Sequence, residues 1–316
     1  MQSAFFEGFR SALVSPRRAS HHRLRARDGA RSGGIGDAAF KLNVSATCIR
    51  FLGSMRPLHP NGFNAAHALL RSMANLGWYA FPGARILDFG CGDGARVYQF
   101  RDEGFDAYGF DMSDTVALRA PDDRAFFSAL EKPRENWSDT RMPDDAVRVP
   151  HDDASFDFVF SETVIEHCYA LDGMMRECAR LLKPGGISLH TYPSRNAVLE
   201  PHFLVPFGGR IQDDRWLKLW ATLGVRNWGQ REMTAAQAAY HNRFYLDSGI
   251  CYRSNDEIIA TARKHFNHAR FVDREYYADD GRAERLRRYW RAIRSEKPLE
   301  EIAAIPRLCI LMARHA

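Results

Sequence analysis

The segment RILDFGCGDGARV, from Arg85 to Val97, is the feature that most constrains the fold. An apolar run is followed by three glycines at alternate positions and then by a helix-forming stretch. A strand, a glycine-rich turn and a helix in this order form an α/β unit whose turn lets a ligand approach the backbone. Asp88 lies near the end of the run and Asp93 lies inside the turn. Carboxylates at this place repel phosphate groups, which otherwise bind well at a helix N-terminus.

Strand and helix patterns alternate from Gly83 onward, which predicts an α/β fold with a mostly parallel sheet. Strands are expected at ARILDF, DAYGFD, SFDFVFS and ISLHTY, and helices at ARVYQFRDEG and ALDGMMRECARLL. The apolar residues of the second helix fall on one face, which should pack on the sheet. These residues are Met174, Met175, Cys178, Leu181 and Leu182.

A long aromatic segment after Pro193 interrupts the alternation. It is divided by Pro and Gly, so it predicts a helical insertion over residues 193–245 that packs on the sheet or forms a roof over a pocket. The alternation then returns with a helix at SNDEIIATARKHF and a strand at ARFVDREYY. A basic helix near AERLRRYWRAI and a last strand at RLCILMA complete an α/β domain over residues 83–316.

The N-terminal residues differ in composition from the rest. Between Arg10 and Arg31 there are seven arginines and a single acid, so residues 1–35 predict a basic and largely disordered extension. A surface for acidic partners or an organelle transit peptide are the alternatives. Residues 36–82 contain GFNAAHALLRSMANLGW and predict a helical segment.

Composition limits the location of the protein. No apolar run approaches the roughly 20 residues that cross a membrane, so we expect no membrane span. The six cysteines are scattered and form no CxxC pair. This pattern favours a reducing compartment, and we predict a cytoplasmic location.

The carboxylates around the glycine turn predict a ligand that is cationic and has no phosphate. S-adenosylmethionine is such a ligand, because it carries a sulfonium, an ammonium, a ribose and an adenine. Asp111 closes the second predicted strand, 17 residues after Gly94, where a carboxylate can accept hydrogen bonds from both ribose hydroxyls.

Four segments resemble, in order, the motifs of class I S-adenosylmethionine-dependent methyltransferases. They are ILDFGCGDG, YGFDMSD, VPHDDASFDFVFSETVIEHC and ECARLLKPGGISLHTYPSR. The resemblance is to the broad group with an FD…S…EH…LKPGG signature, and it covers about Arg85 to Arg195. It implies a Rossmann-like, doubly wound sheet of seven strands, with a last antiparallel strand that RLCILMA would supply.

The resemblance also implies where the cofactor binds. Asp88, Gly90 and Gly92 would line its methionine end, and Ser161 and Glu162 would face the same half.

The other half of the cofactor involves a second set of residues. Asp111 and Met112 would contact the ribose and the adenine. Asp145, followed by Ala146, matches the family's acid for the adenine amino group, although the segment after Asp111 is longer here than in the family.

Three histidines are candidates for a catalytic base. His190 lies near the end of the fifth strand, at the usual active edge of such a sheet. His167 follows the fourth strand and matches the family's EH pair. His202 lies in the insertion beside Glu200, which would orient it. For each of them a structural role in packing or hydrogen bonding is the alternative.

The expected reaction is methyl transfer to oxygen or nitrogen of a small-molecule or saccharide acceptor. A nucleic-acid acceptor is disfavoured, because there is no Asn/Asp-Pro-Pro-aromatic segment after the fourth strand and no Pro-Cys pair. We expect no metal, since His151–Asp153 and His21–His22 lack spaced partners. An NAD(P)-dependent oxidoreductase and a non-catalytic methyltransferase-like partner subunit are the alternatives. The sequence predicts no oligomeric state.

Overall fold

The computed structural model describes residues 65–112, 116–130, 143–197, 199–276 and 308–313. The predicted basic extension and the predicted basic helix near AERLRRYWRAI lie outside these ranges, as does most of segment 36–82. In the part of the chain that is described, every helix is too short or too polar to cross a lipid bilayer.

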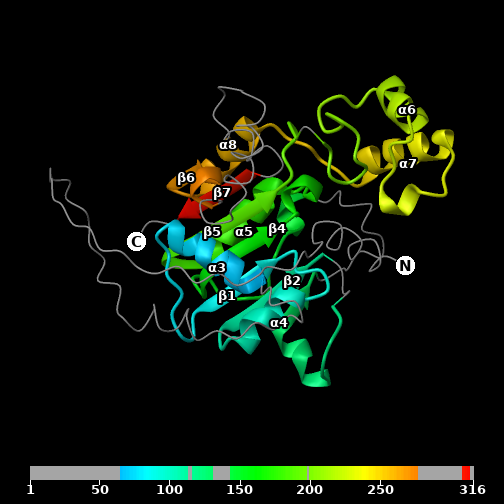
Figure 1. Cartoon of the computed structure of the whole chain (residues 1–316). Helices are drawn as coiled ribbons and strands as arrows, with labels where there is room; N and C mark the ends of the chain where they lie inside the picture. The colour runs from blue at the N-terminus through cyan, green and yellow to red at the C-terminus, as the bar shows by residue number, and fades with distance from the viewer. Residues whose placement is uncertain (1–64, 113–115, 131–142, 198, 277–307, 314–316) are drawn as a thin grey trace, which may run out of the picture. The chain divides into compact units, whose positions relative to one another are not determined.

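The described strands form one sheet in the order β3-β2-β1-β4-β5-β7-β6 (Figure 1). From β3 to β5 the strands run parallel, whereas β7 is antiparallel to both β5 and β6. The predicted α/β fold with a mostly parallel sheet is confirmed. The strands are β1 (Arg85–Phe89), β2 (Asp106–Asp111), β3 (Phe127–Ala129), β4 (Phe156–Glu162), β5 (Leu182–Tyr192), β6 (His268–Phe271) and β7 (Leu308–Ala313).

The strand order reverses direction at β1, which has β2 on one side and β4 on the other. In an open α/β sheet, ligands bind outside the carboxyl ends of the strands at this point. Phe89 pairs with Phe110 of β2, and Asp88 pairs with Phe160 of β4. The register therefore brings the ends of the three strands to one edge, where the glycine turn begins.

Successive strand residues point to opposite sides of the sheet, and here both sides are apolar. Helices therefore cover both faces. Val159 belongs to the apolar cluster under α5 and α8. Its neighbours Phe158 and Phe160 contact Trp78 and Phe100, at ring-centroid distances of 5.1 and 5.6 Å. Trp78 follows α3 and Phe100 belongs to α4. The helices are α3 (Ala65–Asn75), α4 (Ala95–Asp102), α5 (Leu171–Leu181), α6 (Asp214–Thr222), α7 (Ala235–Ser248), α8 (Asn255–His265) and α9 (Asp273–Tyr276).

The apolar face predicted for α5 is confirmed. All five of its residues, Met174, Met175, Cys178, Leu181 and Leu182, are fully buried, although Leu182 already belongs to β5. The helix ends before the KPGG segment, where Gly185 takes a φ of 76°. Proline cannot continue a helix and glycine accepts the left-handed region, so the sequence stops α5 at this place.

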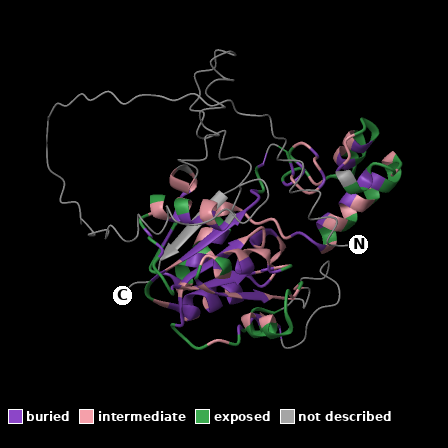
Figure 2. Cartoon of the chain, turned by 60° about the horizontal axis from the view of Figure 1, so that its bottom comes forward, coloured by how far each residue is buried: buried purple, intermediate pink, exposed green. Residues whose placement is uncertain are grey.

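The segment after β5 forms a lobe around α6 and α7. Phe203, Val205, Leu217, Leu246 and Ile250 make up an apolar cluster of this lobe, distinct from the cluster under α5. Figure 2 shows that the central strands of the sheet are mostly buried, whereas α6 and α7 are largely exposed or half-buried.

Capping boxes stand at the beginning of α7, which belongs to this lobe, and of α8, which follows it. Thr234 and Gln237 form a capping box at α7, and Ser254 and Glu257 form one at α8. Each box satisfies backbone N–H groups that have no partner within the helix.

Two elements differ from the sequence-based expectation. The three-residue strand β3 was not predicted, and β6 ends at Phe271, after which α9 begins at Asp273. Short 3₁₀ helices also connect the main elements: η1 (Pro121–Phe126), η2 (Asp144–Ala146), η3 (Ile165–His167) and η4 (Trp228–Gln230).

We expect Met174→Ala to lower the free energy of unfolding by about 2–5 kcal/mol, because it leaves a cavity under α5. Leu223→Ala is the control, since that side chain is 64% exposed and its loss should change stability by less than about 0.5 kcal/mol. Urea unfolding followed by circular dichroism measures both. Equal losses in the two variants would contradict the assignment of the core.

Candidate active site

Glycines in the left-handed region build the turn after β1. Gly90, Gly92 and Gly94 have φ values of 84°, 54° and 78°, a region that glycine enters without strain. The N–H groups of Gly90 and Cys91 both donate to the carbonyl oxygen of Phe110, at 2.7 and 3.1 Å. The end of β2 therefore holds the turn in place.

The surroundings of the three glycines differ. A Cβ on Gly90 would overlap Val164, and a Cβ on Gly94 would lie 2.8 Å from the ring of Phe127. At Gly92, no described atom lies within 4 Å of the position that a Cβ would take. Packing thus closes two of the glycines, and the third faces open space where a ligand can reach the backbone.

Carboxylates surround this turn. Oδ2 of Asp111 accepts a hydrogen bond from the N–H of Gly92 at 2.8 Å. Burial raises the pKa of Asp88 well above its usual value, and the negative charges of Glu162, Asp111 and Asp93 raise it further. Acids this close together disfavour a phosphate and favour a cationic ligand.

Glu162, the last residue of β4, forms an ion pair at this edge of the sheet. Nε of Arg96, in the first turn of α4, donates to Oε2 of Glu162 at 2.7 Å. Both side chains are partly exposed. The ion pair joins the end of β4 to the helix after the glycine turn. Arg96 was not among the predicted site residues. Its position at the start of the helix after the glycine turn could have indicated it.

The structure favours a structural role for His190, which was one of the candidate bases. His190 has no exposed surface, its Nδ1 lies 2.7 Å from Oγ of Ser161, and its Nε2 lies 2.8 Å from Oγ of Ser188. Burial lowers its pKa to about 3. A fully buried ring whose two nitrogens both contact buried hydroxyls is not exposed to a substrate in this structure.

Ser161 is corrected for the same reason. Its side chain is fully buried, and its hydroxyl points across to His190 of the neighbouring strand. The side chain therefore does not face the cofactor edge.

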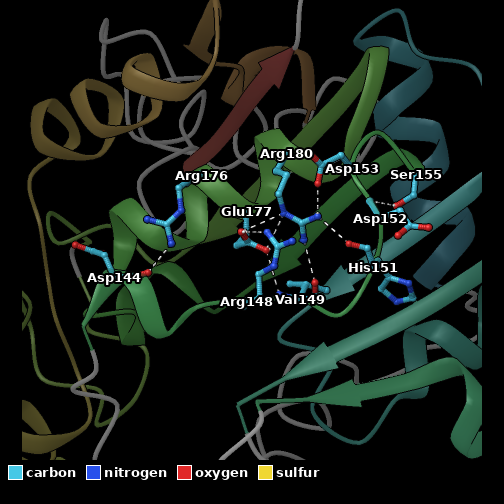
Figure 3. A network of polar contacts seen from close by, with 10 residues as sticks. All are labelled: Asp144, Arg148, Val149, His151, Asp152, Asp153, Ser155, Arg176, Glu177 and Arg180. Atoms are coloured by element: carbon cyan, nitrogen blue, oxygen red, sulfur yellow. Dashed lines mark hydrogen bonds and ion pairs between the residues drawn. The ribbon is translucent and has the colours of Figure 1, made fainter.

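The residues predicted for the adenine lie on two elements. Asp145 and Ala146 are exposed on η2, and Met112, which follows β2, is half-buried against the cluster under α5. Oδ1 of Asp144 accepts a hydrogen bond from the N–H of Gly173 at 2.9 Å. Figure 3 shows η2 lying beside α5, and the contacts of Asp144 join the two elements.

Arg180 of α5 holds the segment that follows η2 (Figure 3). Its guanidinium donates to the carbonyl oxygens of Val149 and His151, at 2.9 and 2.7 Å. It also pairs with Glu177 and Asp153, at 2.8 and 2.7 Å. This network has a structural role, since it fixes η2 and its connection to β4 against α5.

The turn after β4 packs against the glycine turn and is followed by a second cluster of polar side chains. Thr163 has a φ of 57°, which is strained for a β-branched residue and is typical of functional sites. Val164 then packs against Gly90. Glu166 and His167 follow on η3, and Glu166 is only 2% exposed.

His167 and His202 meet beside this turn. Their ring centroids are 5.2 Å apart, so residues distant in the sequence come together. Nδ1 of His167 donates to the carbonyl oxygen of Gly249 at 2.5 Å. Burial lowers the pKa of His167 to about 4, and the nearby charge of His202 acts in the same direction.

Glu200 orients His202, as the sequence predicts. Oε1 of Glu200 accepts from Nδ1 of His202 at 2.6 Å and from the hydroxyl of Tyr252 at 2.5 Å. Oε2 accepts from the backbone N–H groups of His202 and Phe203, both at 2.8 Å. Although burial raises the pKa of Glu200, the charge of His202 and these hydrogen bonds lower it below its usual value. The sequence gives no signal for Tyr252, which is 52 residues from Glu200.

A family model described as a methyltransferase domain matches residues 63–244, more than half of the 316 residues. Malonyl-[acyl-carrier protein] O-methyltransferase of Enterobacter lignolyticus is 30% identical over 108 residues, which are 34% of this chain and 38% of that protein. Phosphoethanolamine N-methyltransferase 2 of Caenorhabditis elegans is 33% identical over 114 residues, which are 35% and 24%.

The chain spans about two fifths or less of the length of these two relatives. A structure of phosphoethanolamine N-methyltransferase 2 from Haemonchus contortus in complex with S-adenosyl-L-methionine superposes with a TM-score of 0.43 and 15% identity. The superposition covers 85% of this chain and 56% of that one.

We expect Gly92→Ala to weaken binding of S-adenosylhomocysteine at least tenfold, or by about 1.4 kcal/mol, because its Cβ would enter the open space above the turn. Gly104→Ala is the matched control, with a φ of 87° and no described atom near its Cβ, at the other end of α4. Both variants should lose about 1 kcal/mol of stability through backbone strain. Calorimetric titration showing equal affinity for the two variants would place the ligand elsewhere.

Proposed function

The chain belongs to the class I S-adenosylmethionine-dependent methyltransferases, and we propose that it methylates oxygen or nitrogen of a small-molecule or saccharide acceptor. The observation that supports this best is the acid-lined glycine turn at the point where the strand order reverses. Residues of this turn fit a cationic nucleoside and do not fit a diphosphate.

Seven residues would hold the cofactor, S-adenosylmethionine. Asp88, Gly90 and Gly92 would bind the methionine end, and Asp111, next to Met112, would accept from the ribose hydroxyls. Asp111 is suited to this because its hydrogen bond with Gly92 already fixes its carboxylate at the turn. Asp145 and Ala146 are proposed for the adenine, on the η2 turn that α5 holds. When bound, the cofactor supplies a methyl group on a positively charged sulfur.

Both alternatives to this function have evidence against them. A nicotinamide dinucleotide would place its diphosphate beside Asp88 and Asp111, where the local charge is negative. A non-catalytic subunit needs no ligand site, yet the open space at Gly92 and the buried Asp88 are both retained.

His202 is the proposed group for the acceptor's proton. Its Nδ1 donates to Glu200, so the ring is held in the tautomer whose Nε2 accepts a proton. His167 lies against it and reaches the glycine turn through Val164. These residues align the acceptor with the cofactor and assist loss of its proton.

We further propose that the insertion over residues 193–245 acts as the roof of the acceptor site. His202 comes from this segment, and its position beside His167 supports the proposal. The aromatic residues Phe203, Trp216 and Trp220 pack in the lobe's own cluster with α7, so we assign them to stability.

The acceptor class remains a prediction. The relatives include a malonyl-[acyl-carrier protein], a phosphoethanolamine and a ubiquinone-biosynthesis methyltransferase, so they favour no single acceptor. A cytoplasmic location also stays a prediction, and the free thiols of Cys91, Cys168, Cys178 and Cys251 in the described ranges are compatible with it.

S-adenosylhomocysteine at 100 times its dissociation constant should stabilise the protein by about 2.7 kcal/mol, and NAD should not. Asp111→Ala should weaken this binding by roughly 2–3 kcal/mol, because charge-assisted hydrogen bonds are lost. Asp111→Asn keeps an acceptor for the N–H of Gly92 but removes the negative charge. It therefore separates the effect of the charge on binding from the effect of the loop geometry. Thermal unfolding and calorimetry measure these effects. Stabilisation by NAD alone would contradict the proposed function.

Labelled methyl groups should enter small-molecule or saccharide fractions of an acceptor panel and leave tRNA and DNA unlabelled. With the acceptor found in this way, His202→Ala should lower turnover at least tenfold, or about 1.4 kcal/mol of transition-state stabilisation. Cofactor affinity should stay unchanged.

Trp216→Ala is the comparison for His202→Ala. Its Nε1 donates to the carbonyl oxygen of Pro206 at 2.8 Å, and its ring packs in the lobe cluster. We expect a loss of roughly 3 kcal/mol of stability and unchanged turnover per folded molecule. Unchanged turnover in His202→Ala would remove that residue from the mechanism.

A further inference from the structure

We propose that Glu166, His167 and His202 bind a divalent first-row transition-metal ion. Each of them offers one ligand atom, and these atoms lie within 4.8 Å of one another. For three atoms this close, there is a point that lies within about 2.8 Å of all of them. Inward movement of roughly 0.7 Å per side chain gives the 2.0–2.2 Å typical of nitrogen and carboxylate ligands.

The two imidazoles are oriented as metal ligands usually are. Nδ1 of His167 donates to the carbonyl oxygen of Gly249, and Nδ1 of His202 donates to Glu200. A metal ligand is then the other ring nitrogen, Nε2, in each case. Metal-binding histidines typically donate their second nitrogen to a carbonyl or carboxylate in this way, which fixes both tautomer and orientation.

The backbone around the cluster is fixed from a third direction. The N–H of Cys251 donates to the carbonyl oxygen of Glu166 at 2.6 Å, and the hydroxyl of Tyr252 donates to Glu200. Three segments, η3, the residues after β5 and the residues after α7, are therefore tied together around the proposed ligands. Such a set changes little when an ion binds, so little ordering cost opposes binding.

The chemistry of the donors selects the kind of ion. The side chain of Glu166 is fully buried, with one oxygen 3.8 Å from Nε2 of His167. A buried carboxylate is stabilised by a nearby positive charge. Two imidazoles and one carboxylate suit zinc, iron, cobalt or manganese, whereas magnesium and calcium prefer oxygen ligands.

The site would deepen the proposed function, and this step rests on that function. Three protein ligands leave coordination positions open for acceptor oxygens, as in catalytic metal sites. Val164, two residues before Glu166, packs against the glycine turn, so an acceptor held here lies next to the cofactor edge. We therefore infer an acceptor with two adjacent oxygens, such as a vicinal diol. One nitrogen cannot hold an ion and take a proton at once, so His202 acts as a base only in the metal-free protein.

No metal was expected from the sequence, because the candidates weighed there were His151–Asp153 and His21–His22, which lack spaced partners. Glu166 and His167 are adjacent, but the third ligand is 35 residues further along the chain. Only the fold brings it into reach.

Titration of Co²⁺ or Zn²⁺ into the full chain, first treated with a chelator, tests the proposal. We expect one tightly bound equivalent, and for Co²⁺ an absorption spectrum typical of nitrogen and oxygen ligands. Glu166→Gln and His167→Gln should weaken this binding at least tenfold, and Glu200→Gln should weaken it about tenfold through the orientation of His202. His268→Gln, an exposed histidine on β6, should bind as the unaltered chain does.

The same samples are titrated with S-adenosylhomocysteine, which also reports whether each variant folds. An unaltered chain that binds S-adenosylhomocysteine and shows no Co²⁺ spectrum overturns the metal site and leaves the proposed function standing. Equal metal affinity in Glu166→Gln, His167→Gln and the unaltered chain also overturns it. Metal binding without S-adenosylhomocysteine binding supports the site and contradicts the proposed function.

Discussion

The last two residues of β2 hold the site together. The carbonyl oxygen of Phe110 accepts two N–H groups of the glycine turn, and the carboxylate of Asp111 accepts a third from Gly92. A turn with three left-handed residues exposes backbone N–H groups, which are costly to leave without partners. Because β2 supplies these partners, the turn is rigid, and Val164 can pack against it from the end of β4. The position of the acidic edge follows from this arrangement, and Val164 connects it to the segment that carries His167.

Sequence reasoning identified the elements whose signals are local. The glycine turn, the apolar face of α5 and the strand ending at Asp111 each depend on residues within a few positions of one another. The ligand class followed from charge, because Asp88 and Asp93 adjoin the turn in sequence as well as in space. The orientation of His202 by Glu200 was also predictable, since the two are separated by one residue.

Long-range contacts explain what sequence reasoning missed. His190 was proposed as a base from its place near a strand end, but β4 and β7 flank its strand on either side. Strand β7 lies more than 100 residues further along the chain, so the central position of β5 was not readable from ISLHTY alone. The contacts of Tyr252 and of Gly249 with the histidine pair have the same origin. Strand β3 was not predicted for another reason: three residues are too few to show the alternation of apolar and polar residues that marks a strand.

The placement of β7 between β5 and β6 has a consequence for how the protein is made. In the described sheet, β6 pairs with β7 and is separated by it from β5. During synthesis from the N-terminus, β5 and β6 both emerge before residues 308–313, so one long edge of β5 stays open in the meantime. An open edge of a hydrophobic strand can pair with other chains, so this interval exposes the nascent protein to aggregation. The parallel block from β3 to β5 can form while the ribosome is still at work, but closure of the sheet waits for one of the last strands to be translated.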